Sequence, residues 1–255
     1  MTDQKTKAAR FKALHVAGSP LVLVNVWDAG SARIVAAADA PALATGSWSV
    51  ASAHGASDGE NLDLDLAIAN LARIVATVDL PVSIDIESGY DDPAGTVERT
   101  IDAGAIGCNM EDSFPRDGTL RDIAEQAARI KDARRVADRA GIPYFINART
   151  DVFFQKDERD FAARMGSAIG RAQAYADAGA DGLFVPGLAD LEQIAQLVAA
   201  RPLPVNIMLG TDSPAPGAFA GTGIARLSYG PTPYRRAMQA LEEMAVDVLK
   251  AQSPD

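Results

Sequence analysis

The chain has 255 residues, of which 48% are hydrophobic and 6% aromatic, and its net charge is −10. This acidic balance leaves no basic stripe to neutralise phosphates, which argues against a nucleic-acid partner. No stretch approaches the roughly 18 apolar residues of a membrane span, and no apolar signal region follows the amino-terminal residues. From the lack of such stretches we expect no membrane partner. Because the single Cys108 cannot form an internal disulfide, we expect a cytoplasmic protein.

Short apolar segments alternate with helical patterns along the chain. A helix over Lys5–Val16 comes first, and we expect it to cap the floor of the fold. Most apolar segments are rich in Val, Ile and Leu, which is typical of strands buried on both faces. The expected strands are Leu21–Trp27, Ala42–Thr45, Val82–Glu87, Ile106–Glu111, Tyr144–Arg149, Gly182–Val185, Val205–Met208 and Ala225–Tyr229. Helical patterns cover Leu64–Val78, Thr96–Ala103, Ile123–Ala140, Phe161–Ala178, Leu191–Ala200 and, roughly, Tyr234–Ala251.

Three helix-to-strand connections carry a glycine, at Gly104, Gly141 and Gly179, which suits the residue just after a helix end. Strict alternation of strands and helices predicts parallel βαβ units. Eight such units in a chain of this length predict an α/β fold, a closed (β/α)8 barrel of the TIM type, which typically needs about 250 residues. No linker or change of composition divides the chain, so we expect one domain over residues 1–255.

Polar residues follow the apolar segments at the points where the expected strands end. Because strand residues alternate between faces, Asp85 and Glu87 share one face, as do Asn109 with Glu111 and Asn147 with Arg149. Active sites of this barrel lie at the carboxyl ends of the strands. Further residues at or just past such ends are Asn25, Trp27, Asp28, Thr45, Gly46, Ser47, Asp112, Asp151 and Asn206. The sequence therefore predicts an active site here.

Asp85, Glu87 and Glu111 form a cluster of oxygen ligands that suits Mg²⁺ or Mn²⁺. Zinc is not expected, because the only histidines are His15, in the leading helix, and His54. The alternative is that these acids pair with Arg or Lys at the rim of the barrel. We interpret them as metal ligands.

Arg149 is the candidate clamp for an anionic substrate, because its planar guanidinium matches a carboxylate or phosphonate. A structural ion pair with Glu111 or Asp151 is the alternative, and both roles are compatible. Backbone N–H groups and hydroxyls of Thr45, Gly46 and Ser47 are suited to binding a carboxylate.

The remaining candidates are open to two interpretations. His54, in a polar loop, is either an acid–base group or solvated, whereas Asp58 in the same loop is the better candidate for the surroundings of the metal. Trp48 either forms a wall of the pocket or packs beneath the loop, and we include it with Asn206 among the substrate-binding residues. Cys108 has the opposite strand parity to Glu111, so it is expected in the core.

These segments resemble the isocitrate lyase/phosphoenolpyruvate mutase superfamily nearly end to end. The most specific is Asp85–Tyr90, similar to the D-x-[DE]-x-G-[YF]-G signature of that superfamily, with Asp91 in place of the last glycine. Other segments similar to it, in the same order, are Asn25–Arg33, Asn109–Asp112, Asn147–Asp151 and Ala178–Phe184.

The resemblance implies a Mg²⁺ near Asp85, with Glu87 and Glu111, and a small 2-oxo acid or related carboxylate as ligand. It implies that Thr45, Gly46 and Ser47 form the carboxylate-binding turn, Arg149 binds the substrate and Asp58 belongs to the metal network. The chemistry of the superfamily passes through an enolate, which the metal and the arginine stabilise. We therefore count Arg149, Glu111 and Asp58 as catalytic.

Departures from the superfamily's motifs limit which of its activities we expect for this chain. The lyases carry a K-[KR]-C-G-H loop after the fourth strand, whereas Ser113–Leu120 contains neither Cys nor His. The sixth-strand Glu of the lyases is also missing, because Phe184-Val185-Pro186 stands in its place, and the longer gating loop of the phosphonomutases is absent. The chain thus resembles the phosphonomutase-like branch.

We expect a Mg²⁺-dependent lyase or decarboxylase that acts on a small 2-oxo or 2-hydroxy (di)carboxylic acid. The alternatives are a C–P bond enzyme, mutase or hydrolase, for a phosphonopyruvate-like compound, and a non-catalytic 2-oxo-acid-binding protein. The last helix has a broad apolar stripe that includes Met238, Leu241 and Met244. Packing on its own barrel explains such a stripe, but similar superfamily members often exchange this eighth helix, so we expect a homo-oligomer, a tetramer.

Overall fold

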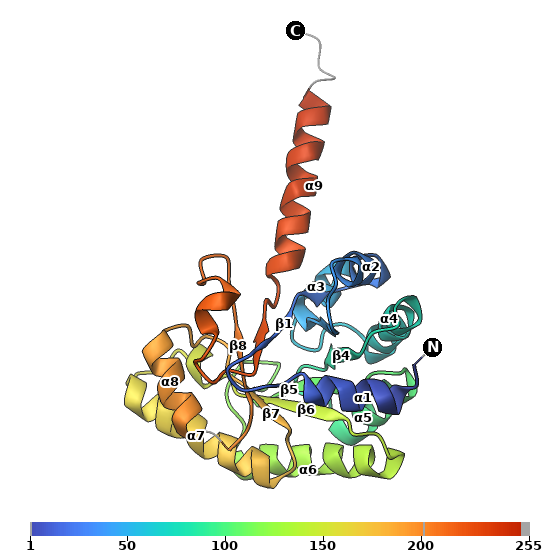
Figure 1. The fold of residues 1–255 in the computed structure, drawn as a ribbon. Coiled ribbons are helices and arrows are strands. Elements are labelled where there is room, and N and C mark those ends of the chain that lie inside the picture. The colour runs from blue at the N-terminus through green and yellow to red at the C-terminus, as the bar shows by residue number, and fades with distance from the viewer. Residues whose placement is uncertain (1, 201, 251–255) are drawn as a thin grey trace.

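Parallel strands surrounded by helices form a nearly closed barrel in the computed structural model, which describes residues 2–200 and 202–250 (Figure 1). The strands are β1 (Leu21–Leu23), β2 (Asn25–Val26), β3 (Leu43–Thr45), β4 (Val82–Asp85), β5 (Gly107–Glu111), β6 (Phe145–Arg149), β7 (Gly182–Phe184), β8 (Val205–Met208) and β9 (Arg226–Ser228). The first predicted strand is interrupted at Val24: β1 pairs with β9 and β2 with β3, so together they close the sheet. The predicted (β/α)8 barrel is confirmed.

The helices lie outside the strands, and several begin at an aspartate whose side chain accepts from a backbone N–H. They are α1 (Gln4–Ala13), α2 (Ala29–Ala37), α3 (Ser47–Ala53), α4 (Leu64–Thr77), α5 (Pro93–Asp102), α6 (Ile123–Ala140), α7 (Phe161–Asp177), α8 (Leu191–Ala200) and α9 (Thr232–Lys250), with 3₁₀ turns η1 (Val152–Phe154) and η2 (Pro216–Phe219). Gly104, Gly141 and Gly179 have φ of 96°, 67° and 98° just after helices, as predicted. Ala251 of the last predicted helix lies outside the described residues.

Helix α1 covers the amino-terminal end of the barrel. Phe11 is fully buried in a cluster with Leu23, Ile106 and Phe145, which point into the barrel. The helix ends at Ala13, three residues earlier than predicted, so His15 lies beyond it, where its ring stacks on Phe145 at 4.0 Å between centroids. The second, larger apolar cluster lies between strands and helices and includes Cys108, as its strand parity predicted.

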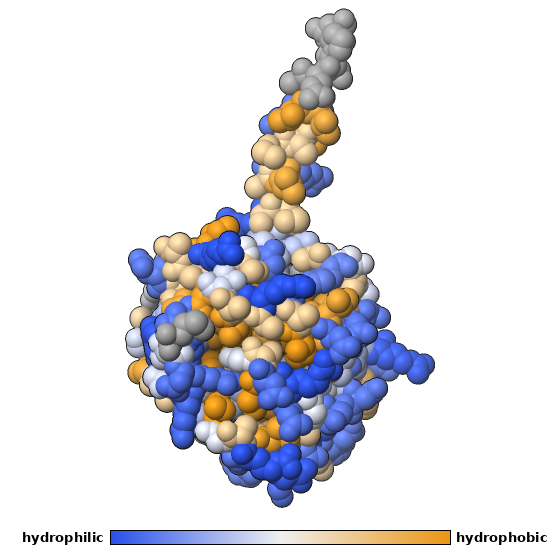
Figure 2. All heavy atoms as spheres, turned by 90° about the vertical axis from the view of Figure 1, so that its right-hand side faces the viewer, coloured by the Kyte–Doolittle hydropathy of each residue, from blue (hydrophilic) through white to orange (hydrophobic). Residues whose placement is uncertain are grey.

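Helix α9 stands away from the barrel (Figure 1) and contains no buried residue within its described length. Met238, Leu241, Met244, Val246, Val248 and Leu249 are exposed on it, and Figure 2 shows apolar side chains along the helix. Near its base, a cavity of about 430 Å³ is lined by Val22, Val24 and Tyr229 beside strands β1 and β9. Within the described chain, no helix combines the length and apolarity needed to span a membrane.

Candidate active site

A cavity of about 300 Å³ opens at the carboxyl ends of the strands. Polar groups from six strands or the segments that follow them reach it, together with apolar side chains. Its lining residues are Asn25, Gly46, Ser47, Trp48, Asp58, Asp85, Asn109, Arg149, Phe154, Phe184, Met208, Ser228, Gly230, Pro231 and Arg235. A cavity lined by acids, two arginines and amides thus lies at the predicted position of the site.

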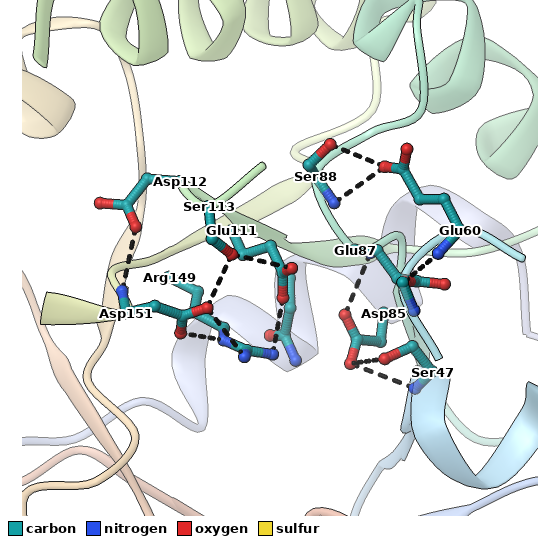
Figure 3. Close-up of polar contacts among 12 residues, drawn as sticks. Ser47, Glu60, Asp85, Glu87, Ser88, Glu111, Asp112, Ser113, Arg149 and Asp151 are labelled. Carbon is teal, nitrogen blue, oxygen red and sulfur yellow. Dashed lines mark hydrogen bonds and ion pairs between the residues drawn. The ribbon is translucent and has the colours of Figure 1, made fainter. Parts of the chain in front are cut away.

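Asp85 is the last residue of β4, and neighbouring residues fix its carboxylate (Figure 3). Ser47 donates to its Oδ2 through the backbone N–H, at 3.2 Å, and through Oγ, at 3.1 Å. Thr45 Oγ accepts from the Asp85 backbone N–H at 3.0 Å. Thr45 does not line the cavity but supports Asp85 from below, whereas Gly46 and Ser47 do line it.

Glu87 lies beyond the end of β4, with φ of 53°, so a turn and not strand alternation places its side chain. The buried carboxylate accepts from the backbone N–H groups of Gly59, at 2.7 Å, and Glu60, at 2.5 Å. Burial, together with the nearby charges of Asp58 and Asp85, raises the pKa of Glu87 to about 8. These acids therefore repel one another in the absence of a cation.

Arg149 forms the ion pairs that the sequence left open beside its predicted role in binding an anionic substrate. Its Nη1 donates to Glu111 at 2.8 Å, and Nε and Nη2 donate to Asp151 at 2.6 and 3.0 Å (Figure 3). Burial opposes the charge of Arg149, but Glu111 and Asp151 outweigh that effect and raise its pKa. Three of the five guanidinium N–H donors are used in this way, which leaves two for an anion in the cavity.

Glu111 and Asp112 are adjacent but face different surroundings. Burial raises the pKa of Glu111, and the charge of Arg149 opposes this. Asp112 is fully buried away from the cavity, where Tyr175 donates to it at 2.7 Å and Arg171 at 3.0 Å. Asp112 therefore links β5 to α7 as a structural group.

The other predicted residues are only partly brought together. Asp58 lines the cavity, and burial and the charge of Asp85 raise its pKa. Trp48 also lines it and packs edge-on against Tyr234, so it forms a wall of the cavity. Asn206 is 1% exposed and accepts from Ser228 below the cavity without lining it, and His54 caps α3 outside the cavity. The predicted contact of Asn206 with substrate stays a prediction.

The structure permits a test of the predicted metal site. Within residues 2–200 and 202–250, no three His, Cys, Asp or Glu side chains converge closely enough to hold an ion together. Glu111 is paired with Arg149, and Glu87 with backbone N–H groups. A Mg²⁺ that keeps several waters needs only one or two carboxylates, however, and Asp85 and Asp58 both line the cavity. The residues thus fit an ion held mainly by Asp85, with the other acids acting through water.

Several residues of the site were not predicted. Arg235, at the start of α9, lines the cavity and lies over the Trp48 ring at 4.5 Å. Phe154 and Phe184 flank Arg149, with its Cζ 5.8 and 5.9 Å from the two ring centroids. Glu60 accepts from the Ser88 hydroxyl at 2.7 Å and holds the turn after β4. Glu60 lies in a loop and Arg235 in a helix, so a search for polar residues at the ends of strands could not find them.

Known proteins resemble this chain over nearly its whole length. The model of the phosphoenolpyruvate phosphomutase family matches residues 11–249. An uncharacterized protein of Mycobacterium tuberculosis (strain H37Rv) is 36% identical over 241 residues, which cover 92% of this chain and 87% of that protein. The phosphoenolpyruvate phosphomutase of Streptomyces hygroscopicus is 30% identical over 253 residues, 91% of this chain and 76% of that enzyme.

Among solved structures, a Burkholderia cenocepacia J2315 protein with a provisional phosphonomutase assignment is 53% identical, with a TM-score of 0.92, and the match covers 96% of this chain and 99% of that one. These findings confirm the resemblance drawn from the motifs. The chain belongs to the phosphoenolpyruvate phosphomutase family and is an enzyme of the isocitrate lyase/phosphoenolpyruvate mutase superfamily of lyases and mutases.

Proposed function

We propose that this enzyme is a Mg²⁺-dependent lyase or decarboxylase that acts on a small 2-oxo or 2-hydroxy dicarboxylic acid through an enolate. The cavity carries this proposal, because Arg149 lines it together with Asp85 and Asp58. Its two guanidinium groups, Arg149 and Arg235, suit an acid with two anionic groups. A cytoplasmic location is part of the proposal, in keeping with the single, buried cysteine.

Each residue has a role that its surroundings support. Arg149 binds and orients a carboxylate with its two remaining N–H donors, while Glu111 and Asp151 hold the guanidinium plane in place. Asp85 would hold Mg²⁺, with Glu87 acting through water, and the bound metal would supply a Lewis acid that stabilises negative charge on the substrate. Phe154, Phe184 and Met208 supply an apolar wall that limits water around the reacting bond.

The shortened loop after β5 does not forbid this chemistry. Loss of carbon dioxide from a 2-oxo acid such as oxaloacetate needs stabilisation of an enolate, but no catalytic cysteine. The enolate must then gain a proton, and Asp58 lines the cavity with a raised pKa, which suits a group that delivers one. Asp58 is therefore the proposed acid.

C–P bond chemistry on a phosphonopyruvate-like compound is the second candidate. The identity to a phosphoenolpyruvate phosphomutase, 30% over 91% of the chain, supports it. Against it, the segment after β5, where phosphonomutases carry a longer gating loop, is short.

A substrate panel with Mg²⁺ and with EDTA tests the proposal, using oxaloacetate, phosphonopyruvate and methylisocitrate. We expect Mg²⁺-dependent release of pyruvate from oxaloacetate. Turnover of phosphonopyruvate alone would favour the second candidate. Tight binding of oxalate, which mimics the enolate, with turnover of none of the three would favour a non-catalytic 2-oxo-acid-binding protein.

A further inference from the structure

Arg226 is a fully buried cation in the interior of the barrel. It lies on β9, in register with Leu21 of β1 and Asn206 of β8, and its Cζ is 6.0 Å from the Phe11 ring at the floor. Among the described residues, no carboxylate lies within 4.0 Å of it, and its Nε and Nη1 have no hydrogen-bond partner. A guanidinium buried in this way is costly, so a purely structural role would be served better by an apolar side chain.

Among the described residues, the side chain of Arg226 makes one hydrogen bond, and it leads to the candidate active site. Its Nη2 donates to Asn109 Oδ1 at 3.3 Å, and Asn147 Nδ2 donates to the same oxygen at 2.9 Å. Arginine has only donors, so the atom of Asn109 that faces it must be the oxygen. Two donors at Oδ1 therefore fix the orientation of the Asn109 amide, because rotation by 180° would set N–H groups against one another.

The other end of this amide belongs to the cavity. Asn109 pairs in register with Asp85 on the neighbouring strand, and both residues line the cavity. Within the described part of the chain, Asn109 Nδ2 has no hydrogen-bond partner, whereas Oδ1 has two. Donation to Oδ1 by a cation also polarises the amide and makes its N–H groups stronger donors.

We propose that Asn109 is a substrate-binding residue whose side-chain N–H groups donate to an oxygen of the bound acid, and that Arg226 is the positioning residue that orients this amide. The inference deepens the proposed function and rests on it. A donor fixed in advance and aimed at an oxygen that gains negative charge stabilises an enolate without reorganisation. The buried charge of Arg226 thereby serves the site through Asn109.

The test is the affinity for oxalate in the presence of Mg²⁺, measured by calorimetry, and the melting temperature of each variant. Asn109→Asp replaces the donor by an acceptor and gives Arg226 an ion-pair partner, so we expect a higher melting temperature. Asn109→Ala removes the side-chain hydrogen bond that Arg226 makes within the described structure, so we expect a lower melting temperature. For both variants we expect the affinity for oxalate to fall about tenfold or more. A change of stability cannot explain this shared loss, because the melting temperatures of the two variants change in opposite directions.

Two further variants separate positioning from structure. Arg226→Met leaves Asn109 in place but frees its amide, and we expect weaker oxalate binding with little loss of stability, partly restored in Arg226→Lys. Gln4→Glu is the matched control, since the Gln4 amide on α1 also donates to buried groups, the Ile101 and Ala105 carbonyls, and does not line the active-site cavity. We expect this control to keep the wild-type affinity for oxalate.

Wild-type affinity in Asn109→Asp or Asn109→Ala would overturn the assignment of Asn109 and leave the proposed function intact. Wild-type affinity in Arg226→Met would overturn the positioning role. If the wild-type protein does not bind oxalate with Mg²⁺, the proposed function fails, and this inference fails with it.

Discussion

Replacing Arg149 by lysine keeps the positive charge of the site but removes the planar guanidinium. In the native protein this group makes three charge-assisted hydrogen bonds, to Glu111 at 2.8 Å and to Asp151 at 2.6 and 3.0 Å, while its side chain is 18% exposed. A lysine ammonium cannot bind Asp151 through two parallel N–H groups and still present two more to a carboxylate. We therefore expect substrate affinity or turnover to fall by roughly one to three orders of magnitude, about 1.4 kcal/mol for each factor of ten.

The fold should largely survive this change. The lysine still neutralises Glu111 and Asp151, whereas Arg149→Met would leave two buried acids without a cation, at a cost of about 3–5 kcal/mol in the free energy of unfolding. The assay combines oxalate binding, steady-state kinetics on oxaloacetate and denaturant unfolding for Arg149→Lys.

Arg159→Lys is the control, because the Arg159 guanidinium also donates twice to an aspartate, at 2.8 and 2.6 Å to Oδ2 of Asp157, but at the surface. We expect the control to behave as wild type in all three assays. Near-normal affinity and turnover in Arg149→Lys would refute the reasoning and remove this arginine from the site.

Four further predictions follow from the same structure. Asp85→Asn should abolish metal-dependent activity. Its thermal stability in EDTA should stay the same or rise, because the substitution removes one of several mutually repelling acids. A large loss of stability in EDTA would instead indicate that Asp85 forms a structural salt bridge. Thiol-modifying reagents should leave turnover unchanged, because Cys108 is fully buried and burial raises its pKa to about 12; rapid inactivation that oxalate prevents would contradict this placement. Burial and the charge of Arg226 lower the pKa of His15 to about 3, so the neutral ring contributes stability above pH 6.5, and this stability is lost as the pH falls toward 3. In acid-unfolding scans, the His15→Phe variant should therefore lose stability less steeply than the wild type. Parallel curves for the two proteins would exclude His15 as a cause of acid unfolding. We propose that a second copy of the chain covers the apolar side chains of α9, with each α9 packing at the cavity beside β1 and β9 of its partner. Light scattering should then show a homo-oligomer, a tetramer. A monomer near 27 kDa at micromolar concentration would count against this assembly.

The sequence by itself determined the barrel and pointed to the strand ends where the structure has a polar cavity. The alternation of apolar segments with helical patterns, and glycines such as Gly141 at helix ends, are local signals that the tertiary structure did not override. Strand parity correctly placed Cys108 in the core and brought Glu111 and Arg149 to neighbouring positions, since a parallel sheet repeats one rule on every strand. The motif around Asp85 also led to the correct superfamily.

Only the tertiary structure decided which polar side chains reach the cavity and which bind to other parts of the protein. A turn with positive φ carries Glu87 toward the backbone of Gly59, and Asp112 points to Tyr175 instead of the cavity. Strand alternation does not extend past the end of a strand, so it could not predict either contact. The hydrogen bond from Arg226 to Asn109 joins residues 117 positions apart, on strands that are not neighbours in the sheet. Such contacts depend on side chains that meet inside the closed barrel, and no pattern along the chain records their distances.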